Sequence, residues 1–126
     1  MQGMRFTVPI HLHGTLAANA QGRFQLPCAA VLQEVSAVGS NAHNATLQVG
    51  TSAAATGIMT ATAIGVSGTP TVWTKTNFNG SLYTDPNDVD DLVLADNTIM
   101  DWVLDFDGAA GTAGQNVTIM FTFIEG

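Results

Sequence analysis

Alternation of apolar and polar residues predicts a β-strand near the start of the chain. From Arg5 to His13, every second residue is apolar, and Thr7 and His11 are among the residues between them. A period of two is expected for a strand with one buried and one exposed face. Pro9 falls on the exposed face, and proline is tolerated best in an edge strand. We therefore expect this segment to lie at the edge of a sheet.

The C-terminal segment contains two more alternating runs, separated by a turn rich in Gly, Ala and Thr at 108–114. In the first run, apolar residues alternate with Asp101, Asp105 and Asp107. In the second run, every second residue from 117 to 123 is apolar. This pattern predicts an antiparallel hairpin whose inner face is apolar and whose outer face carries the aspartates.

Further strands are predicted between the two ends of the chain. They span residues 22–27, 29–40, 44–51, 58–65 and 69–78. The apolar spacing of 29–40 also suits one face of a helix, and we favour the strand. The Thr-rich runs favour strands because β-branched side chains suit a pleated surface. Gly57 interrupts any helix in the Ala-rich segment 52–57, which is expected to be a loop.

Residues 79–97 form the longest irregular stretch and are expected to be a long acidic loop. Asp85 could cap a helix of one or two turns, with Pro86 in the first turn. Residues 1–4 are expected to form an N-terminal arm. The remaining pattern gives eight strands without βα alternation, so residues 1–126 are expected to form one all-β domain. The predicted fold is an eight-stranded antiparallel β-sandwich of the jelly-roll type.

Composition narrows the classes of function. Charged residues make up 10 % of the chain and the formal net charge is −7, with only three basic residues. Nucleic-acid binding needs Lys and Arg to replace phosphate counterions, so no direct nucleic-acid partner is expected. No segment approaches the roughly 20 apolar residues of a membrane span. The N-terminus also lacks the pattern of a signal peptide, which predicts synthesis in a cytoplasm.

Histidine and cysteine are the first candidates for chemistry. His11 and His13 would project from one face of a strand, close enough to share a metal ion. No carboxylate follows them in the next residues, and His43 lies elsewhere in a predicted loop. We expect two exposed histidines and no bound metal or other cofactor. Cys28, in an apolar run without a neighbouring base, is expected to be a small buried side chain.

Carboxylates give no active-site pattern. The acidic residues of the 79–97 loop lack the glycine and the distal glutamate of a helix-loop-helix calcium site. These acidic residues are Asp85, Asp88, Asp90, Asp91 and Asp96. Asp105 and Asp107 lie on one strand face, so they cannot flank a glycosidic bond from two sides. No nucleophile motif or phosphate-binding loop is present either. We therefore expect the protein not to be an enzyme.

Aromatic side chains could form a platform for a sugar. Trp102 alternates with apolar residues and is expected to be buried, whereas Trp73 shares a face with Thr71 and Lys75 and is expected to be exposed. Together with Tyr83, these are too few for a convincing platform. The candidate interface residues are Asp101, Asp105, Asp107, Trp73, His11 and His13.

Three sequence blocks resemble a group of small virion proteins encoded by tailed bacteriophages. They are "LPCAAVLQEVSAVGSNAHNATLQVGTS", "AIGVSGTP" and "LDFDGAAGTAGQNVTIMFTFIEG", which together cover slightly less than half of the chain. The group is similar to jelly-roll decoration, or cement, proteins on the outside of an assembled head, commonly trimers. The group also resembles tail and fibre modules that are built on the same sandwich fold. The resemblance brings no catalytic residues.

The expected function is therefore a capsid decoration protein in the virion. The resemblance implies a homotrimer on the capsid exterior whose partner is the major capsid protein. Such a protein buries apolar surface at a repeated site, and few charged side chains need to be ordered there. Its acidic outer face could meet basic patches of the shell. The alternatives are a tail, fibre or carbohydrate-binding sandwich that contacts a host surface, and a metal-dependent jelly-roll enzyme that uses His11 and His13.

Overall fold

The computed structural model describes residues 4–78 and 93–125, which contain nine β-strands and no α-helix. The strands are β1 (Arg5–Thr15), β2 (Ala20–Gln25), β3 (Ala30–Val38), β4 (Thr46–Thr51), β5 (Ala54–Ala63), β6 (Thr71–Thr74), β7 (Val93–Leu94), β8 (Ile99–Asp105) and β9 (Gln115–Glu125). A short 3-10 helix, η1 (Lys75–Asn77), follows β6. The all-β class predicted from the alternation is confirmed, and the ambiguous segment 29–40 forms a strand.

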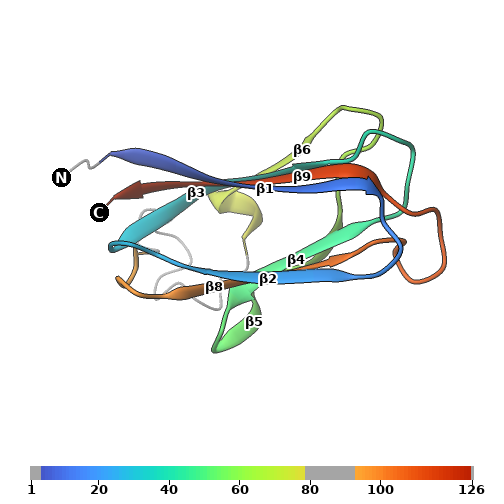
Figure 1. Cartoon of the computed structure of the whole chain (residues 1–126). Helices are drawn as coiled ribbons and strands as arrows, with labels where there is room; N and C mark the ends of the chain where they lie inside the picture. Colours follow the sequence, from blue (N-terminus) through green and yellow to red (C-terminus); the bar gives the residue numbers. More distant parts are fainter. Residues whose placement is uncertain (1–3, 79–92, 126) are drawn as a thin grey trace.

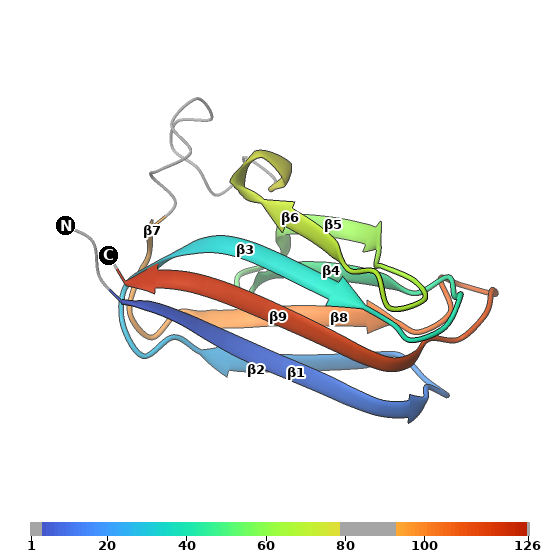
Figure 2. The same ribbon diagram turned by 90° about the horizontal axis from the view of Figure 1, so that it is seen from above.

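The strands form two antiparallel sheets that lie face to face (Figure 1). The first sheet has the order β1-β9-β3-β6, and β7 also pairs with β3. The second sheet has the order β2-β8-β4-β5. Figure 2 looks onto the first sheet, with the second sheet behind it. The edge position predicted for the first strand is confirmed, because β1 pairs only with β9 in the sheet order.

Two predicted loops contain strand residues. β7 lies in the segment expected to be a loop and pairs with β3 through Leu94 and Val93. Two residues are too short for a detectable period, which explains why the sequence pattern predicts eight strands and the structure has nine. Residues 54–57, also expected to be a loop, belong to β5. The helix expected at Asp85 and residues 1–3 of the expected arm lie outside the described residues.

The predicted C-terminal hairpin is wrong. β8 pairs with β2 and β4 in the second sheet, whereas β9 pairs with β1 and β3 in the first sheet. The connection at 106–114 therefore crosses from one sheet to the other. A hairpin usually has a connection of about two to five residues, and this one is longer. Alternation correctly identified both strands and their inner faces, but not their partners.

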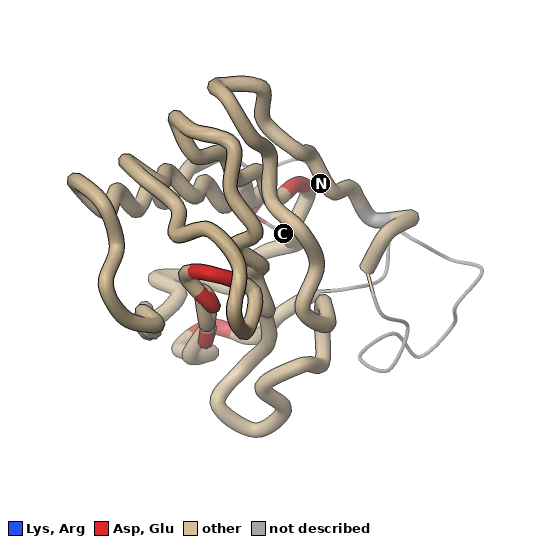
Figure 3. Tube along the Cα trace, turned by 90° about the vertical axis from the view of Figure 1, so that its right-hand side faces the viewer, with Lys and Arg blue, Asp and Glu red and all other residues tan. Residues whose placement is uncertain are grey.

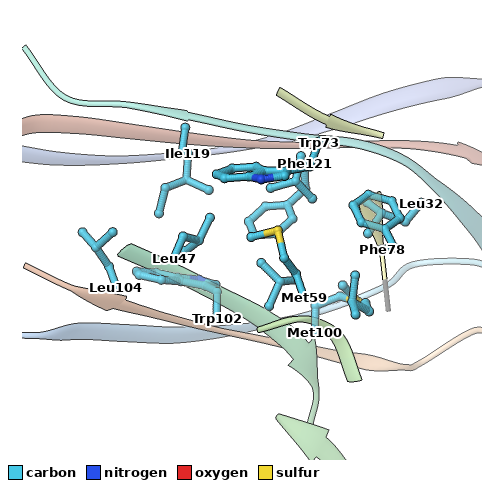
Figure 4. Packing of buried hydrophobic residues seen from close by; sticks show 14 of the residues in the cluster. Leu32, Leu47, Met59, Trp73, Phe78, Met100, Trp102, Leu104, Ile119 and Phe121 are labelled. Carbon is cyan, nitrogen blue, oxygen red and sulfur yellow. The ribbon is translucent and has the colours of Figure 1, made fainter. Parts of the chain in front are cut away.

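The core fills the space between the two sheets (Figure 4). From β9, the side chains of Val117, Ile119, Phe121 and Phe123 are all 0 % exposed, as the alternation predicts. The ring of Phe24 from β2 lies 5.2 Å from that of Phe121, so aromatic contacts join the two sheets. Burial of such side chains is the main term that stabilises a sandwich of this kind.

Strand β1 covers one side of this core. Its inner residues Phe6, Val8, Ile10 and Leu12 are half-buried and pack against the central cluster. Phe6 stacks on Phe123 with ring centroids 5.2 Å apart. The outer residues of the strand are exposed, so the predicted division between its two faces is confirmed.

Candidate functional site

The two histidines of β1 lie side by side on the outer face of the first sheet. Both are exposed, and their ring centroids are 6.3 Å apart. His11 Nδ1 lies 2.8 Å from the hydroxyl of Thr118 on β9. Within residues 4–78 and 93–125, no group of three or more His, Cys, Asp or Glu side chains could hold a metal ion. The described residues therefore supply this pair and no third ligand.

The C-terminal aspartates are engaged within the chain. Asp101 forms an ion pair of 3.4 Å with Arg23 on β2. The carboxylate of Asp105 accepts hydrogen bonds from the backbone N–H groups of Asp107 and Gly108, at 3.3 and 3.1 Å. Asp107 accepts one from the N–H of Ala109 at 3.1 Å. All three aspartates are half-buried, and Asp105 and Asp107 stabilise the start of the β8–β9 connection.

The expected exposure of Trp73 is wrong. Trp73 and Trp102 are each 6 % exposed, and both belong to the core cluster. Trp73 is opposite Val35 of β3, whose side chain is buried, so the indole faces the second sheet. The polar neighbour Thr71 misled the prediction because it lies on the same inner side and is half-buried. Tyr83 lies outside the described residues.

A pocket lies beside Trp73, between the edge strands of the two sheets. Its volume is about 350 Å³, and the side chains around it are those of Met59, Thr60, Thr62, Trp73 and Asn77. The carboxamide oxygen of Asn77 already accepts hydrogen bonds from the N–H and hydroxyl of Thr74. The described lining therefore combines one buried indole with hydroxyl and amide groups and carries no charge.

Four connections meet at one end of the sandwich, which we call the loop end. They are residues 16–19, 39–45, 64–70 and 106–114. Backbone hydrogen bonds join them: Leu16 N–H donates to Gly114 O at 3.0 Å, and Asn44 N–H donates to Thr112 O at 3.0 Å. Gly39 N–H donates to Gly65 O at 2.9 Å. Loops that would otherwise move independently are therefore linked to one another.

Asparagine side chains add a second set of links at the loop end. Asn41 donates to Ala113 O at 2.9 Å and accepts from the N–H of Gln115 at 3.0 Å. Asn44 accepts from the N–H of Thr112 at 2.8 Å. These amides bind backbone groups of the β8–β9 connection and of Gln115, the first residue of β9. From the sequence these asparagines are expected only to favour turns, but in the structure their side chains also link neighbouring connections to one another.

His43 is the residue of the loop end that sequence reasoning missed. Its Nε2 donates to Gly65 O at 2.9 Å, and its Nδ1 accepts from the N–H of Ala45 at 3.1 Å. Because a carbonyl oxygen can only accept, the Nε2 that faces Gly65 O carries a proton. His43 therefore ties the β3–β4 connection to the β5–β6 connection. Only the three-dimensional position of Gly65 reveals this role.

Replacing His43 with alanine should lower the free energy of unfolding by about 2 kcal/mol, because two side-chain hydrogen bonds are lost. Chemical denaturation of the two proteins measures this difference. His13→Ala is the matched control, because His13 is exposed and its loss should change stability by less than about 0.5 kcal/mol. Equal effects of the two substitutions would contradict the role given to His43.

The fully exposed residues of the loop end are uncharged, and the half-buried Asp107 is the one Asp, Glu, Lys or Arg in its four connections. Its exposed residues are of the types Ala, Gly, Ser, Thr, Asn and Pro, with Val66 as the one large apolar side chain. Figure 3 looks onto this end, where the tube is mostly tan with a few red segments. A surface of short, internally bonded residues loses little conformational entropy when a partner covers it. The loop end is therefore suited to protein contact.

The other predicted features occupy different places. Cys28 is half-buried rather than fully buried. Asp96 is exposed in the β7–β8 connection, and the other acidic residues of the predicted loop lie outside the described residues. In the described part of the chain, no helix is long and apolar enough to cross a membrane. The structure does not bring the candidate interface residues together into one surface.

These observations define the class of the protein as all-β, with two antiparallel sheets packed face to face. No protein-family model matches the sequence, and no curated protein sequence matches it. Among solved structures, the fold is similar to that of a chain from the cyanophage Pam1 capsid asymmetric unit. The TM-score is 0.52 and the sequence identity is 16 %, and the alignment covers 98 % of this chain and 84 % of the other. At this identity the similarity concerns the fold.

Proposed function

We propose that this chain is a non-enzymatic structural protein of a virion, a decoration or cement protein that binds the outside of a capsid shell. The observation that carries the proposal is the similarity in fold to a capsid chain over 98 % of this chain. The loop end supports the proposal, because it offers a preformed surface for protein contact. The resemblance of the three sequence blocks to phage virion proteins points to the same class.

The proposed fold within the all-β class is a jelly roll, and the strand pairing supports it. Apart from the two-residue β7, the pairs are nested: β1 with β9, β2 with β8, β3 with β6, and β4 with β5. A long nested hairpin that rolls up gives two sheets of four strands, with neighbours in the hairpin on opposite sheets. The additional pairs β3·β9 and β4·β8 are those that rolling creates. Two sheets of this kind are typical of jelly rolls.

In this proposal the chain forms a homotrimer on the capsid exterior and contacts the major capsid protein where capsid subunits meet. Each bound copy ties neighbouring capsomers together. The trimeric state and the capsid partner rest on the resemblance to decoration proteins. The protein carries no chemistry in this role, and its contribution is the apolar and polar surface that it buries at each site.

The proposal is tested by adding the purified protein to heads assembled without it and collecting the heads by sedimentation. We expect saturable binding, with a limiting ratio to the major capsid protein that is a simple fraction. We also expect decorated heads to release DNA at a higher temperature than bare heads, because binding to the assembled shell stabilises it. Absence of binding at every protein concentration would contradict the proposal.

The acidic residues at 101, 105 and 107 give a second test, on the hypothesis that they meet basic patches of the shell. Changing Asp101, Asp105 and Asp107 together to asparagine removes three charges and keeps oxygen acceptors for the backbone N–H groups described above. We expect weaker binding to bare heads and a smaller loss of affinity as salt is raised. Unchanged binding at low salt would show that these aspartates do not meet the shell.

A tail, fibre or carbohydrate-binding module is the second candidate, and the pocket beside Trp73 favours it. Indole, hydroxyl and amide groups are the side chains that sugar sites combine. If this candidate is correct, a glycan should bind at the pocket and change the fluorescence of Trp73, and Trp73→Phe should remove that change. The absence of a response to any glycan of a broad panel would dispose of this candidate.

A further inference from the structure

The outer face of the first sheet has a regular arrangement of side chains. The strand register places residues of four strands side by side in rows across the sheet. One row consists of Pro9, Met120, Ser36 and Val72; the next consists of Thr7, Thr122, Glu34 and Thr74; a third consists of Arg5, Ile124, Val31 and Val93. Figure 2 views the sheet from this side. We infer that this outer face packs against a second copy of the chain.

Exposed apolar side chains gather on this face. Five large apolar residues are exposed in the described part of the chain, and three of them lie here: Val72 at 47 %, Val93 at 52 % and Met120 at 40 %. None of the five lies on β2, β8, β4 or β5, the strands of the second sheet. Exposed apolar groups that cluster on one face are typical of interaction sites, whereas single scattered ones are not.

The polar residues of the face are also suited to burial. Threonine occupies positions on β1, β9 and β6, and its short, stiff side chain loses little rotamer freedom when it is covered. Arg5 and Glu34 are the charged residues in these rows, and their formal charges cancel. A partner can therefore cover the face without removing a large net charge from water.

The charge of the rest of the molecule favours a second copy of the chain as the partner that covers this face. Among residues whose side chains are described, the charged ones away from this face are mainly acidic: Arg23, Asp96, Asp101, Asp105, Asp107 and Glu125. Two copies of an acidic chain repel each other, so they can associate closely only through a surface that has no net charge. On this face the copies would keep the aspartates of the second sheet about one sheet spacing further away, roughly 10 Å, which is more than the Debye length at physiological salt.

A basic partner would bind more tightly to the side of the molecule that carries the aspartates of the second sheet than to this face, which has no net charge. The inference therefore deepens the proposed homotrimer, on which it rests, by naming the surface through which one copy meets another. Strand spacing and rise give the three rows across four strands an area of about 400 Å², compared with about 800 Å² per partner in a standard stable interface. We therefore expect self-association in the micromolar range rather than an obligate complex.

The test is sedimentation equilibrium of the full chain and of a Val72→Lys/Met120→Lys variant across the micromolar range. We expect the wild-type protein to self-associate as its concentration rises. The two lysines should raise the dissociation constant about 100-fold, because each contact between copies would then bury unpaired charges. Thermal unfolding of both proteins checks that these exposed positions accept lysine without unfolding.

The matched control is Val66→Lys, because Val66 is 41 % exposed but lies at the loop end. Self-association should survive this change. A wild-type protein that stays monomeric would overturn the inference, and so would equal effects of the control and the double variant. Binding to bare heads, measured in parallel, separates the two proposals: a monomer that still binds heads contradicts only this inference, whereas wild-type protein that does not bind heads contradicts the proposed function.

Discussion

Replacing Phe121 with alanine should lower the free energy of unfolding by about 4 kcal/mol, a large part of the 5 to 15 kcal/mol that is typical of a domain. The side chain is 0 % exposed and its ring lies 5.2 Å from that of Phe24. It is opposite Val8 on one side and Val35 on the other, so the cavity would open in the middle of the first sheet. The midpoint of thermal unfolding should fall by about 15 °C.

The neighbouring residue provides the control for this prediction. Met120 follows the same backbone, but its side chain points outward and is 40 % exposed. Met120→Ala should change the free energy of unfolding by less than about 1 kcal/mol. Calorimetry of both variants tests the assignment of faces in β9. A larger loss from Met120→Ala than from Phe121→Ala would mean that the strand faces the other way.

After Phe121→Ala, the substitution Gly65→Ala should cause the second largest loss of stability among the proposed changes. A Cβ at this position would lie 2.1 Å from Thr69 O and 2.7 Å from Thr71 N, which are backbone atoms that cannot move aside alone. Gly65 N–H donates to Ala37 O, and Gly65 O accepts from Gly39 and His43. The substitution would therefore displace the β5–β6 connection and break its links. We expect a loss of about 3 kcal/mol in the free energy of unfolding.

Gly68→Ala, in the same connection, separates crowding from backbone strain. Gly68 has a φ of +79°, and nothing lies within 4 Å of an added Cβ. Only the cost of the left-handed conformation remains, about 1 kcal/mol. Denaturant titration of both variants should therefore show a clear difference between them. Equal losses would indicate that the loop end is less tightly packed than its hydrogen bonds imply.

Local pattern predicted the strands and their faces but not their partners. A period of two follows from burial on one side of a strand, so the inner residues of β1 and β9 could be identified directly. The partner of a strand depends on contacts between residues far apart in the chain. β9 pairs with β1 and β3, and the local feature that argues against pairing with β8 is the length of the 106–114 connection. The predicted hairpin failed for this reason.

The candidate site was harder to predict than the fold. The polar neighbours of Trp73 predict an exposed side chain, but a half-buried threonine can share the inner face of a strand that is not fully covered. His43 carries no sequence signal, because both of its partners are backbone groups and one of them belongs to another loop. The cluster on the outer face of the first sheet could not be predicted either, because only the strand register places Val72, Ser36 and Met120 in one row.

We propose that this chain covers a capsid shell, and its copy number in purified particles decides between this role and the alternatives. Quantitative mass spectrometry against the major capsid protein gives the number. A decoration protein should be present at about one copy per capsid subunit, or at a simple fraction of that ratio. A handful of copies per particle, or none, would contradict the claim; a handful would favour a tail or fibre component instead.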